Sequence, residues 1–454
     1  MPSNSRLSRT LQATAPDRRR FLTQMASLPV AAGMLSAVTQ PAQAAAGRSS
    51  VKTSARIVIA GGGAAGLTAA SHLAAALTGA QITVVDAKAQ HHYQPGFTLV
   101  AAGIKPQSYV VSDTRDYLPK GVDWINETVA EIDPEGNKVV TASGKVLPYD
   151  YLIVATGLEL NYAAIEGMET ARIGEDGLGS IYHSPQAASS TWAAMSRFAD
   201  TGGVGLFGRP AGEMKCAGAP LKYTFITDDH LRRRNQRSKA ELIYMAQSKS
   251  LFGVPIVAEK VRMLFQDRGV KVQHEHVMQS IDLGRRIATY RTPGGTAEQS
   301  YDFINVVPPM RAPDVVRNSP LPWTEGPFAT DGWMEVDRNT LRHKRFANVF
   351  GVGDIAGVPK GKTAASVKWQ VPVAVAHLIG DITGQPSRET YNGYTSCPLI
   401  TRLGQAMLIE FDYQDNLVPS FPGVIAPLEE LWISWVMKTM ALKPTYLSML
   451  RGRA

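Results

Sequence analysis

The chain of 454 residues has few cysteines, few charges and no long apolar run. Its two cysteines, Cys216 and Cys397, lie far beyond any metal-knuckle spacing, so the fold must bring them together if they act as a pair. No run of about 18 uninterrupted apolar residues is present, which argues against a membrane-spanning helix. Charged residues make up 19%, and the net charge of +8 is too mild to indicate nucleic-acid binding. The 44% of hydrophobic residues predicts two or three domains with large cores.

The N-terminal segment is typical of an export signal. A basic stretch that contains Arg18-Arg19 and Phe21-Leu22 precedes a modestly apolar segment and ends at Ala42-Gln43-Ala44. This pattern resembles a twin-arginine signal and predicts a leader over residues 1–44, with a disordered basic tail as the alternative. The predicted destination is the periplasmic face of the cytoplasmic membrane. That compartment permits disulfides, which suits a working cysteine pair.

A glycine-rich turn follows the first apolar strand, at residues 55–60. The turn matches G-x-G-x-x-G, an alanine-rich helix runs on to about residue 77, and a strand at 81–85 leads to Asp86. This unit predicts a dinucleotide site in which helix N–H groups face phosphates and the aspartate accepts hydrogen bonds from a ribose. A purely structural glycine turn is the alternative. The predicted cofactor residues are Gly61, Gly63, Ala64, Ala65, Gly66 and Asp86.

Later apolar strands alternate with helical patterns. The strands are expected at 151–155, 204–207, 241–246, 303–307 and 348–352. Alternation of this kind predicts an α/β fold with parallel sheets, here two Rossmann-like dinucleotide-binding domains and a C-terminal helical region. The expected parts are a first FAD-binding segment at 55–160, a second Rossmann-like domain at 161–320, a second FAD-binding segment at 321–390 and a C-terminal region at 391–454.

Two further motifs indicate which dinucleotide binds. Ala155-Thr156-Gly157 ends one strand, and Gly353-Asp354 ends another before a helix that begins near Thr363. Together with the glycine turn, these motifs resemble the two-dinucleotide-binding-domain flavoproteins, which bind FAD. The resemblance implies that Asp354 holds the ribityl or pyrophosphate part and that the following helix directs its positive end at the flavin. Singly, each motif is also compatible with a surface turn.

Residues 203–208 form a second G-x-G-x-x-G pattern, at about the place of an NADH site in pyridine-nucleotide relatives. Its glycines fall before and within the apolar strand, and no clear Rossmann helix opens after it. We interpret the match as coincidental and expect the second domain to have lost nicotinamide binding.

The segments around the two cysteines are the most specific feature. Cys216 lies on a Gly/Pro-rich turn in PAGEMKCAGAPLKYTF (210–225), where Lys215 and Lys222 favour a thiolate. Cys397 lies between Ser396 and Pro398 in YNGYTSCPL (391–399), which predicts another exposed turn. These segments, with VVPPMRAPDVV (306–316) and IEFDY (409–413), resemble sulfide:quinone oxidoreductases of the two-cysteine branch. Two buried cysteines that act as small hydrophobic residues are the alternative.

The resemblance implies catalytic roles for Cys216 and Cys397 and a noncovalent FAD, because residues 91–100 contain no cysteine that could tether the flavin. It also places Lys362 near the flavin, where a lysine could stabilise the anionic reduced ring; a solvated loop lysine is the alternative. The adjacent His91 and His92 have no Cys or His partner at metal spacing, so we expect no metal site.

The C-terminal stretch is rich in aromatic and apolar residues. Trp432, Trp435 and Met440 recur at helical spacing with Lys438 interspersed, and Pro444 predicts a break in the helix. Short amphipathic pieces of this kind suit attachment to a membrane surface, with a core or dimer helix as the alternative. Phe411 and Tyr413 are candidates for lining a quinone pocket.

The predicted function is oxidation of sulfide to sulfane sulfur or polysulfide, with electrons passed through FAD to a ubiquinone-type quinone. A flavocytochrome c-type sulfide dehydrogenase, an NADH:quinone oxidoreductase and a non-catalytic flavin-binding redox partner are the alternatives. We expect peripheral membrane association and no nucleic-acid partner. The sequence is compatible with a homo-oligomer but does not decide the oligomeric state.

Overall fold

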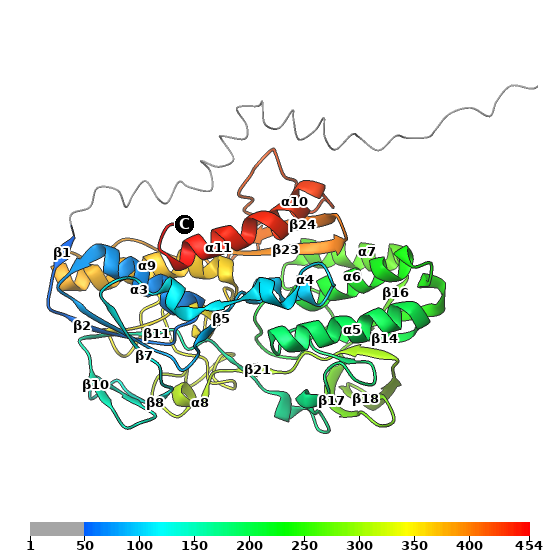
Figure 1. Ribbon diagram of the computed structural model, residues 1–454, viewed down its shortest axis with the longest axis horizontal. Helices are drawn as coiled ribbons and strands as arrows, with labels where there is room; N and C mark the ends of the chain where they lie inside the picture. The colour runs from blue at the N-terminus through cyan, green and yellow to red at the C-terminus, as the bar shows by residue number, and fades with distance from the viewer. Residues whose placement is uncertain (1–49) are drawn as a thin grey trace, which may run out of the picture. The chain divides into compact units, whose positions relative to one another are not determined.

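The computed structural model describes residues 50–454, and the predicted leader at 1–44 lies outside the described residues. Two five-stranded sheets, each entirely parallel, dominate the described part, together with several small antiparallel pieces (Figure 1). The predicted α/β class with Rossmann-like sheets is therefore confirmed. The boundaries between the predicted domains stay a prediction.

The first sheet has the strand order β22-β11-β2-β4-β7. Its central strands are short apolar runs that are almost fully buried, as expected for a parallel sheet covered by helices. The strands are β2 (Arg56–Ala60), β4 (Gln81–Val85), β7 (Val122–Ile125), β11 (Tyr151–Val154) and β22 (Val349–Gly351). The helices α3 (Ala64–Ala76) and α9 (Ala364–Thr383) pack against each other beside this sheet (Figure 1). Strand β22 thus brings a distant part of the chain into the same sheet as the glycine turn.

The second sheet, drawn mainly in green in Figure 1, has the order β13-β20-β14-β15-β16. Its strands are β13 (Leu178–Gly179), β14 (Gly203–Gly208), β15 (Ala240–Ala246), β16 (Val270–His274) and β20 (Phe303–Asn305). The helices α5 (Pro185–Thr201), α6 (Ala219–Arg233) and α7 (Pro255–Asp267) accompany it. Predicted strands at 204–207, 241–246 and 303–307 are thereby found in one sheet.

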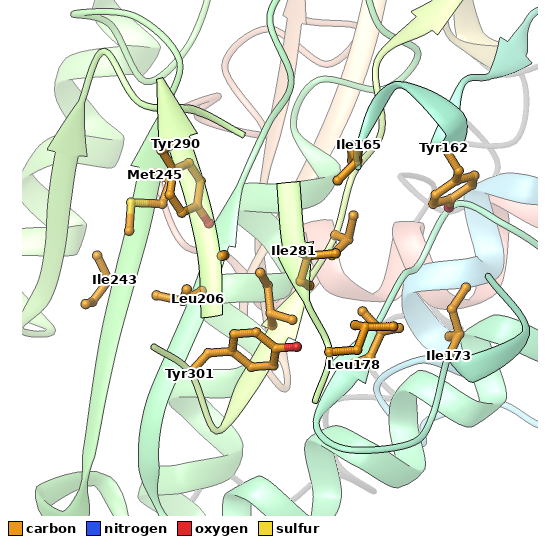
Figure 2. Close-up of a cluster of buried hydrophobic side chains, with 14 of the residues drawn as sticks. Tyr162, Ile165, Ile173, Leu178, Leu206, Ile243, Met245, Ile281, Tyr290 and Tyr301 are labelled. Carbon is orange, nitrogen blue, oxygen red and sulfur yellow. The ribbon is translucent and has the colours of Figure 1, made fainter. Parts of the chain in front are cut away.

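An antiparallel sheet of β17 (Val277–Asp282), β18 (Ile287–Thr292) and β19 (Gly295–Ser300) packs beside the second sheet. One cluster of buried side chains joins the two: Leu206 and Ile243 from the parallel strands meet Ile281 and Tyr290 from the antiparallel ones (Figure 2). Burial of such side chains stabilises the fold by about 1.5–3 kcal/mol each. This shared core fixes the antiparallel sheet over one end of the parallel strands.

The remaining small elements connect these layers. A second antiparallel sheet consists of β8 (Val129–Asp133), β9 (Lys138–Thr141) and β10 (Val146–Pro148). The other short elements are β1 (Val51–Lys52), β3 (Leu77–Thr78), β5 (Gln90–His92), β6 (Val111–Asp113), β12 (Glu159–Leu160), β21 (Met310–Arg311), α4 (Phe97–Val100) and α8 (Asp314–Arg317).

The C-terminal region begins with an antiparallel pair, β23 (Thr395–Arg402) and β24 (Gln405–Phe411). It continues as α10 (Trp432–Val436), a π-helical stretch η9 (Met437–Ala441) and α11 (Leu442–Leu450), drawn in red in Figure 1. The expected break at Pro444 is wrong. This proline is inside a continuous helical run, because α11 follows directly on η9, and a π-helical turn is one of the irregularities that accompany a proline within a helix.

Helix α11 is anchored on α3 and on β5. The Ser71 hydroxyl of α3 donates to the carbonyl of Leu450 at 2.7 Å, and the His91 ring lies 2.7 Å from the Tyr446 hydroxyl. His91 is therefore a packed histidine, and burial lowers its pKa to about 4, so the ring is neutral at pH 7. Within residues 50–454 no helix is both long enough and apolar enough to cross a membrane.

Candidate functional site

Cys216 lies on the connection between β14 and α6 and has a left-handed backbone, with φ of 47°. Its N–H donates to the Lys362 carbonyl at 3.0 Å, and its own carbonyl accepts from Ala219 N at 2.8 Å and from the Tyr182 hydroxyl at 2.9 Å. A non-glycine residue in this conformation persists only where its surroundings fix it. These three hydrogen bonds hold the half-buried thiol in one position.

Cys397 lies inside β23, opposite Ile409 of β24, and is only 5% exposed. The expected exposed turn is therefore wrong. Pro398 was the reason for that expectation, but β23 belongs to a two-stranded sheet, and an edge strand tolerates a proline that cannot donate to the ladder. The strand presents the Cys397 sulfur to the start of α6.

The fold brings the two free thiols together. The Cys397 thiol forms a hydrogen bond to the Cys216 sulfur, and this interaction is the main cause of a pKa well below the ordinary value for Cys216. Gly218 makes the approach possible, because a Cβ at this position would lie 2.3 Å from the Cys397 sulfur. The predicted convergence of the two cysteines is thus observed.

Positive charge surrounds the pair. The buried Lys222 ammonium donates to the Cys216 sulfur at 3.5 Å, and both Lys222 and Lys438 lower the pKa of Cys216. The N-terminus of α6, immediately after Gly218, adds the positive end of a 15-residue helix. The pKa of Cys397 is instead raised, first by its hydrogen bond to Cys216 and then by burial. The arrangement therefore favours a thiolate on Cys216 and a thiol on Cys397.

Lys438 is a site residue that the sequence analysis missed. The sequence analysis noted it only as a polar residue interspersed in an amphipathic stretch, but it is only 3% exposed and donates to the Pro95 carbonyl at 2.8 Å. Burial, with a contribution from Lys222, lowers its pKa to about 7. The local sequence does not separate Lys438 from Lys443 in the same helical stretch, so only tertiary packing reveals which lysine points inward.

The glycine turn after β2 has the geometry of a phosphate cradle. A Cβ on Gly61, whose φ is 110°, would meet the Ala155 carbonyl at 2.4 Å, and a Cβ on Gly66 would meet the Gly61 carbonyl at 1.8 Å. By contrast, no atom lies within 4 Å of a Cβ placed on Gly63, at the start of α3. Asp86 accepts from Gly62 N at 2.6 Å, which holds the turn. Ala64 and Ala65 form the first turn of α3, so the open space faces free helix N–H groups.

The other predicted FAD residues lie on the neighbouring strands. Ala155, Thr156 and Gly157 follow β11 next to β2, and the buried Thr156 hydroxyl oxygen has no hydrogen-bond partner. A Cβ on Gly157 would also meet open space. Gly353 and Asp354 follow β22, and Thr363 caps α9 by accepting from Ser366 N at 3.1 Å. The open glycine positions and the unpartnered hydroxyl fit a bound dinucleotide.

Lys362 is buried rather than solvated. Its ammonium donates to the carbonyls of Asp354 and Ala356 at 2.7 and 2.9 Å and lies 3.7 Å from the Trp333 ring centroid. Burial lowers the pKa of Lys362 to about 8, and burial raises the pKa of Asp354. Because the Lys362 carbonyl accepts from Cys216 N, the segment of the predicted flavin lysine also fixes the reactive cysteine.

Comparisons with known proteins agree with this geometry. A protein-family model for pyridine nucleotide-disulphide oxidoreductases matches residues 55–204. The mitochondrial sulfide:quinone oxidoreductase of Mus musculus is 35% identical, covering 81% of this chain and 80% of the mouse protein. The Dictyostelium discoideum counterpart is also 35% identical, covering 89% and 87%. The chain belongs to the sulfide:quinone oxidoreductase family.

A solved sulfide:quinone oxidoreductase from Aquifex aeolicus has the same fold, with a TM-score of 0.73 and 22% identity over 88% of this chain and 92% of that chain. Family membership supports sulfide oxidation with quinone as acceptor over the cytochrome-dependent and NADH-dependent alternatives. The predicted cofactor, FAD, is confirmed as that of the family. Its noncovalent attachment stays a prediction.

The two quinone candidates lie in different surroundings. Phe411, at the end of β24, is buried in an edge-to-face contact with Phe252, and the Lys360 ammonium lies 5.3 Å from its ring centroid. Tyr413 packs against Tyr391, and its hydroxyl donates to the Arg338 carbonyl. The structure thus fixes Tyr413 by local contacts, and a quinone role for either residue stays a prediction.

The second glycine pattern lies wholly inside β14, and the next helix, α6, starts only at Ala219. The intervening segment carries Cys216 instead of a phosphate-binding turn.

Among the described residues, no three His, Cys, Asp or Glu side chains gather so that they could hold a metal ion.

Proposed function

We propose that this chain oxidises sulfide at Cys216 and Cys397 and passes the electrons to a membrane quinone. The observation that supports this assignment is the meeting of two distant thiols at the start of α6, beside two buried lysines. Two thiols within hydrogen-bonding range can form a disulfide, and a disulfide can accept a sulfur nucleophile.

In the proposed resting state the two sulfurs form a disulfide. Hydrosulfide attacks the Cys397 sulfur, a new S–S bond forms there as a persulfide, and the old bond breaks with its electron pair on Cys216. Cys216 is the better leaving group because the Lys222 ammonium donates to its sulfur and stabilises the departing thiolate, and thiols of lower pKa leave faster. Lys222 then neutralises the released thiolate at 3.5 Å.

The residues proposed to hold FAD are the glycine turn with Asp86, the turn at Thr156 and the start of α9 at Thr363. Bound FAD supplies the two-electron acceptor for the thiol pair and the donor for quinone. The chain's own contribution is to hold Cys216 by three hydrogen bonds and to keep positive charge beside it.

Cys216→Ser and Cys397→Ser variants test the assignment. Each should bind FAD normally and show bleaching of the flavin by sulfide that is slower by at least about 10³-fold, because removal of a reacting nucleophile costs this much or more. Anaerobic stopped-flow absorbance measures the bleaching, with dithionite reduction as the control for flavin competence. Rapid bleaching of either variant by sulfide would refute the mechanism.

We further propose export by the segment 1–44 and attachment to the periplasmic membrane surface. Support for export comes from the paired arginines Arg18 and Arg19. Support for attachment comes from exposed apolar side chains in the C-terminal region, Val424 at 59% and Met440 at 68% exposure. Replacement of both arginines by lysine should retain the enzyme in the cytoplasmic fraction, and Met440→Ser should weaken flotation with liposomes. Unchanged fractionation or flotation would contradict the respective proposal.

A further inference from the structure

A cavity of about 140 Å³ opens at the carboxyl ends of β14 and β20 in the second sheet. The carboxyl edge of an open α/β sheet is where such folds bind ligands. Neither cysteine lines this cavity, and the proposed oxidation of sulfide makes no use of it.

Two hydrogen-bond donors in the cavity wall have no partner. Asn305 is 2% exposed; its side-chain oxygen accepts from Ile181 N at 3.3 Å, and this fixes the amide so that the buried NH₂ group remains unpartnered. Arg209 also lines the cavity, and its Nε is buried without a partner. Within residues 50–454 the Arg209 guanidinium forms neither a hydrogen bond nor an ion pair. Buried donors in native proteins are nearly always satisfied, so two at one cavity point to a missing acceptor.

The rest of the wall is largely apolar, with Ile165, Met245, Met278 and Tyr290 among the lining residues. The volume is below the roughly 300–1,000 Å³ of pockets for drug-sized ligands, so a dinucleotide does not fit. A guanidinium pairs most specifically with a planar carboxylate through two parallel hydrogen bonds. An apolar body with a carboxylate head satisfies both the wall and the donors.

We propose that this cavity binds a small organic carboxylate, with Arg209 and the Asn305 amide as donors to its oxygens. The site lies at the end of the second G-x-G-x-x-G pattern and selects its ligand by size and charge. It is a second ligand site, next to the segment that leads from β14 to Cys216.

Isothermal titration calorimetry of the FAD-loaded enzyme with benzoate tests the proposal. Benzoate has the required size, apolar ring and carboxylate, and benzamide is its neutral counterpart. We expect saturable binding of one benzoate per chain and at least tenfold weaker binding of benzamide. Absence of saturable benzoate binding, or equal binding of benzamide, would overturn the proposal.

Variants locate the site. Arg209→Gln and Asn305→Asp should each weaken benzoate binding at least tenfold, the first by loss of the cation and the second by repulsion between carboxylates. Arg291→Gln, which changes an exposed arginine next to Tyr290 in β18, should bind benzoate like the wild type. The flavin spectrum and melting temperature without benzoate show that each variant is folded. Unchanged affinity in folded Arg209→Gln, or NADH that binds and displaces benzoate, would refute the assignment.

Discussion

The two parallel sheets use the same strand-to-helix connection for different anions. In the first sheet, β2 ends at Ala60 and α3 starts at Ala64, so three glycines bring helix N–H groups next to open space. In the second sheet the glycines lie inside β14, and a longer connection carries Cys216 to the start of α6. One helix N-terminus is thus open to a phosphate, whereas the other faces a thiolate that belongs to the chain itself.

The two sites also differ in which groups supply the positive charge that faces the anion. Backbone groups of the glycine turn supply the donors of the phosphate cradle, so a short stretch of sequence specifies this part of the FAD site. The second site depends on Lys222 from α6, Lys438 from the C-terminal helices and Cys397 from β23. A local site and an assembled site should therefore respond differently to substitution.

The largest expected effect comes from Gly218→Ala in the assembled site. The added Cβ would lie 2.3 Å from the Cys397 sulfur, while the backbone at Gly218 has φ of −81° and accepts alanine. We expect the thiols to separate and the bleaching of the flavin by sulfide to slow about 10²-fold, because a misplacement of about 1 Å costs this much. FAD content should be normal.

Gly253→Ala is the matched control, since a Cβ at this position meets no atom within 4 Å. Stopped-flow absorbance compares both variants with the wild type. If sulfide bleached the flavin of Gly218→Ala as fast as that of Gly253→Ala, flavin reduction would not require close contact of the two thiols.

In the local site, Gly63→Ala should affect the cofactor alone. No protein atom lies within 4 Å of the added Cβ, so the protein without FAD should melt at the wild-type temperature. We expect FAD to bind at least about tenfold more weakly, because close approach of backbone to phosphate requires glycine. Fluorescence titration with FAD measures the affinity. Wild-type affinity would show that the pyrophosphate lies elsewhere.

The smallest expected effect is a pH-dependent one, from Lys438→Met. Lys438 has a pKa of about 7 and, while charged, lowers the pKa of Cys216. The charge of Lys438 therefore stabilises the Cys216 thiolate below pH 7, and this stabilisation is lost as the pH rises through about 7. The variant should therefore bleach more slowly than the wild type by about tenfold at pH 6, and the two rates should converge above pH 8.

Lys443→Met, on the following turns of the same region, is the control, because Lys443 donates to the Tyr109 carbonyl and is not among the groups that shift the Cys216 pKa. A Lys438→Met profile parallel to the wild type at every pH would show that the charge does not act on the thiolate.

The contrast between local and assembled sites also explains what the sequence could predict. The glycine turn, its strand, its helix and Asp86 follow from neighbouring residues, and the structure has them where expected. Cys216 and Cys397 could be paired only through a family resemblance, because no local rule relates residues so far apart. Lys438 and Cys397 were misplaced for one reason: helical spacing and a proline describe local preferences, and tertiary packing overrode both.

The anchoring of α11 on α3 has a consequence for the order of folding. Cys216, Cys397 and Lys438 meet only after contacts between distant parts of the chain have closed, and such contacts form slowly. A nascent or partly denatured molecule therefore has ordinary cysteines without an acidic thiol. In the reduced enzyme, rapid alkylation of Cys216 at mildly acidic pH therefore marks the molecules that have matured.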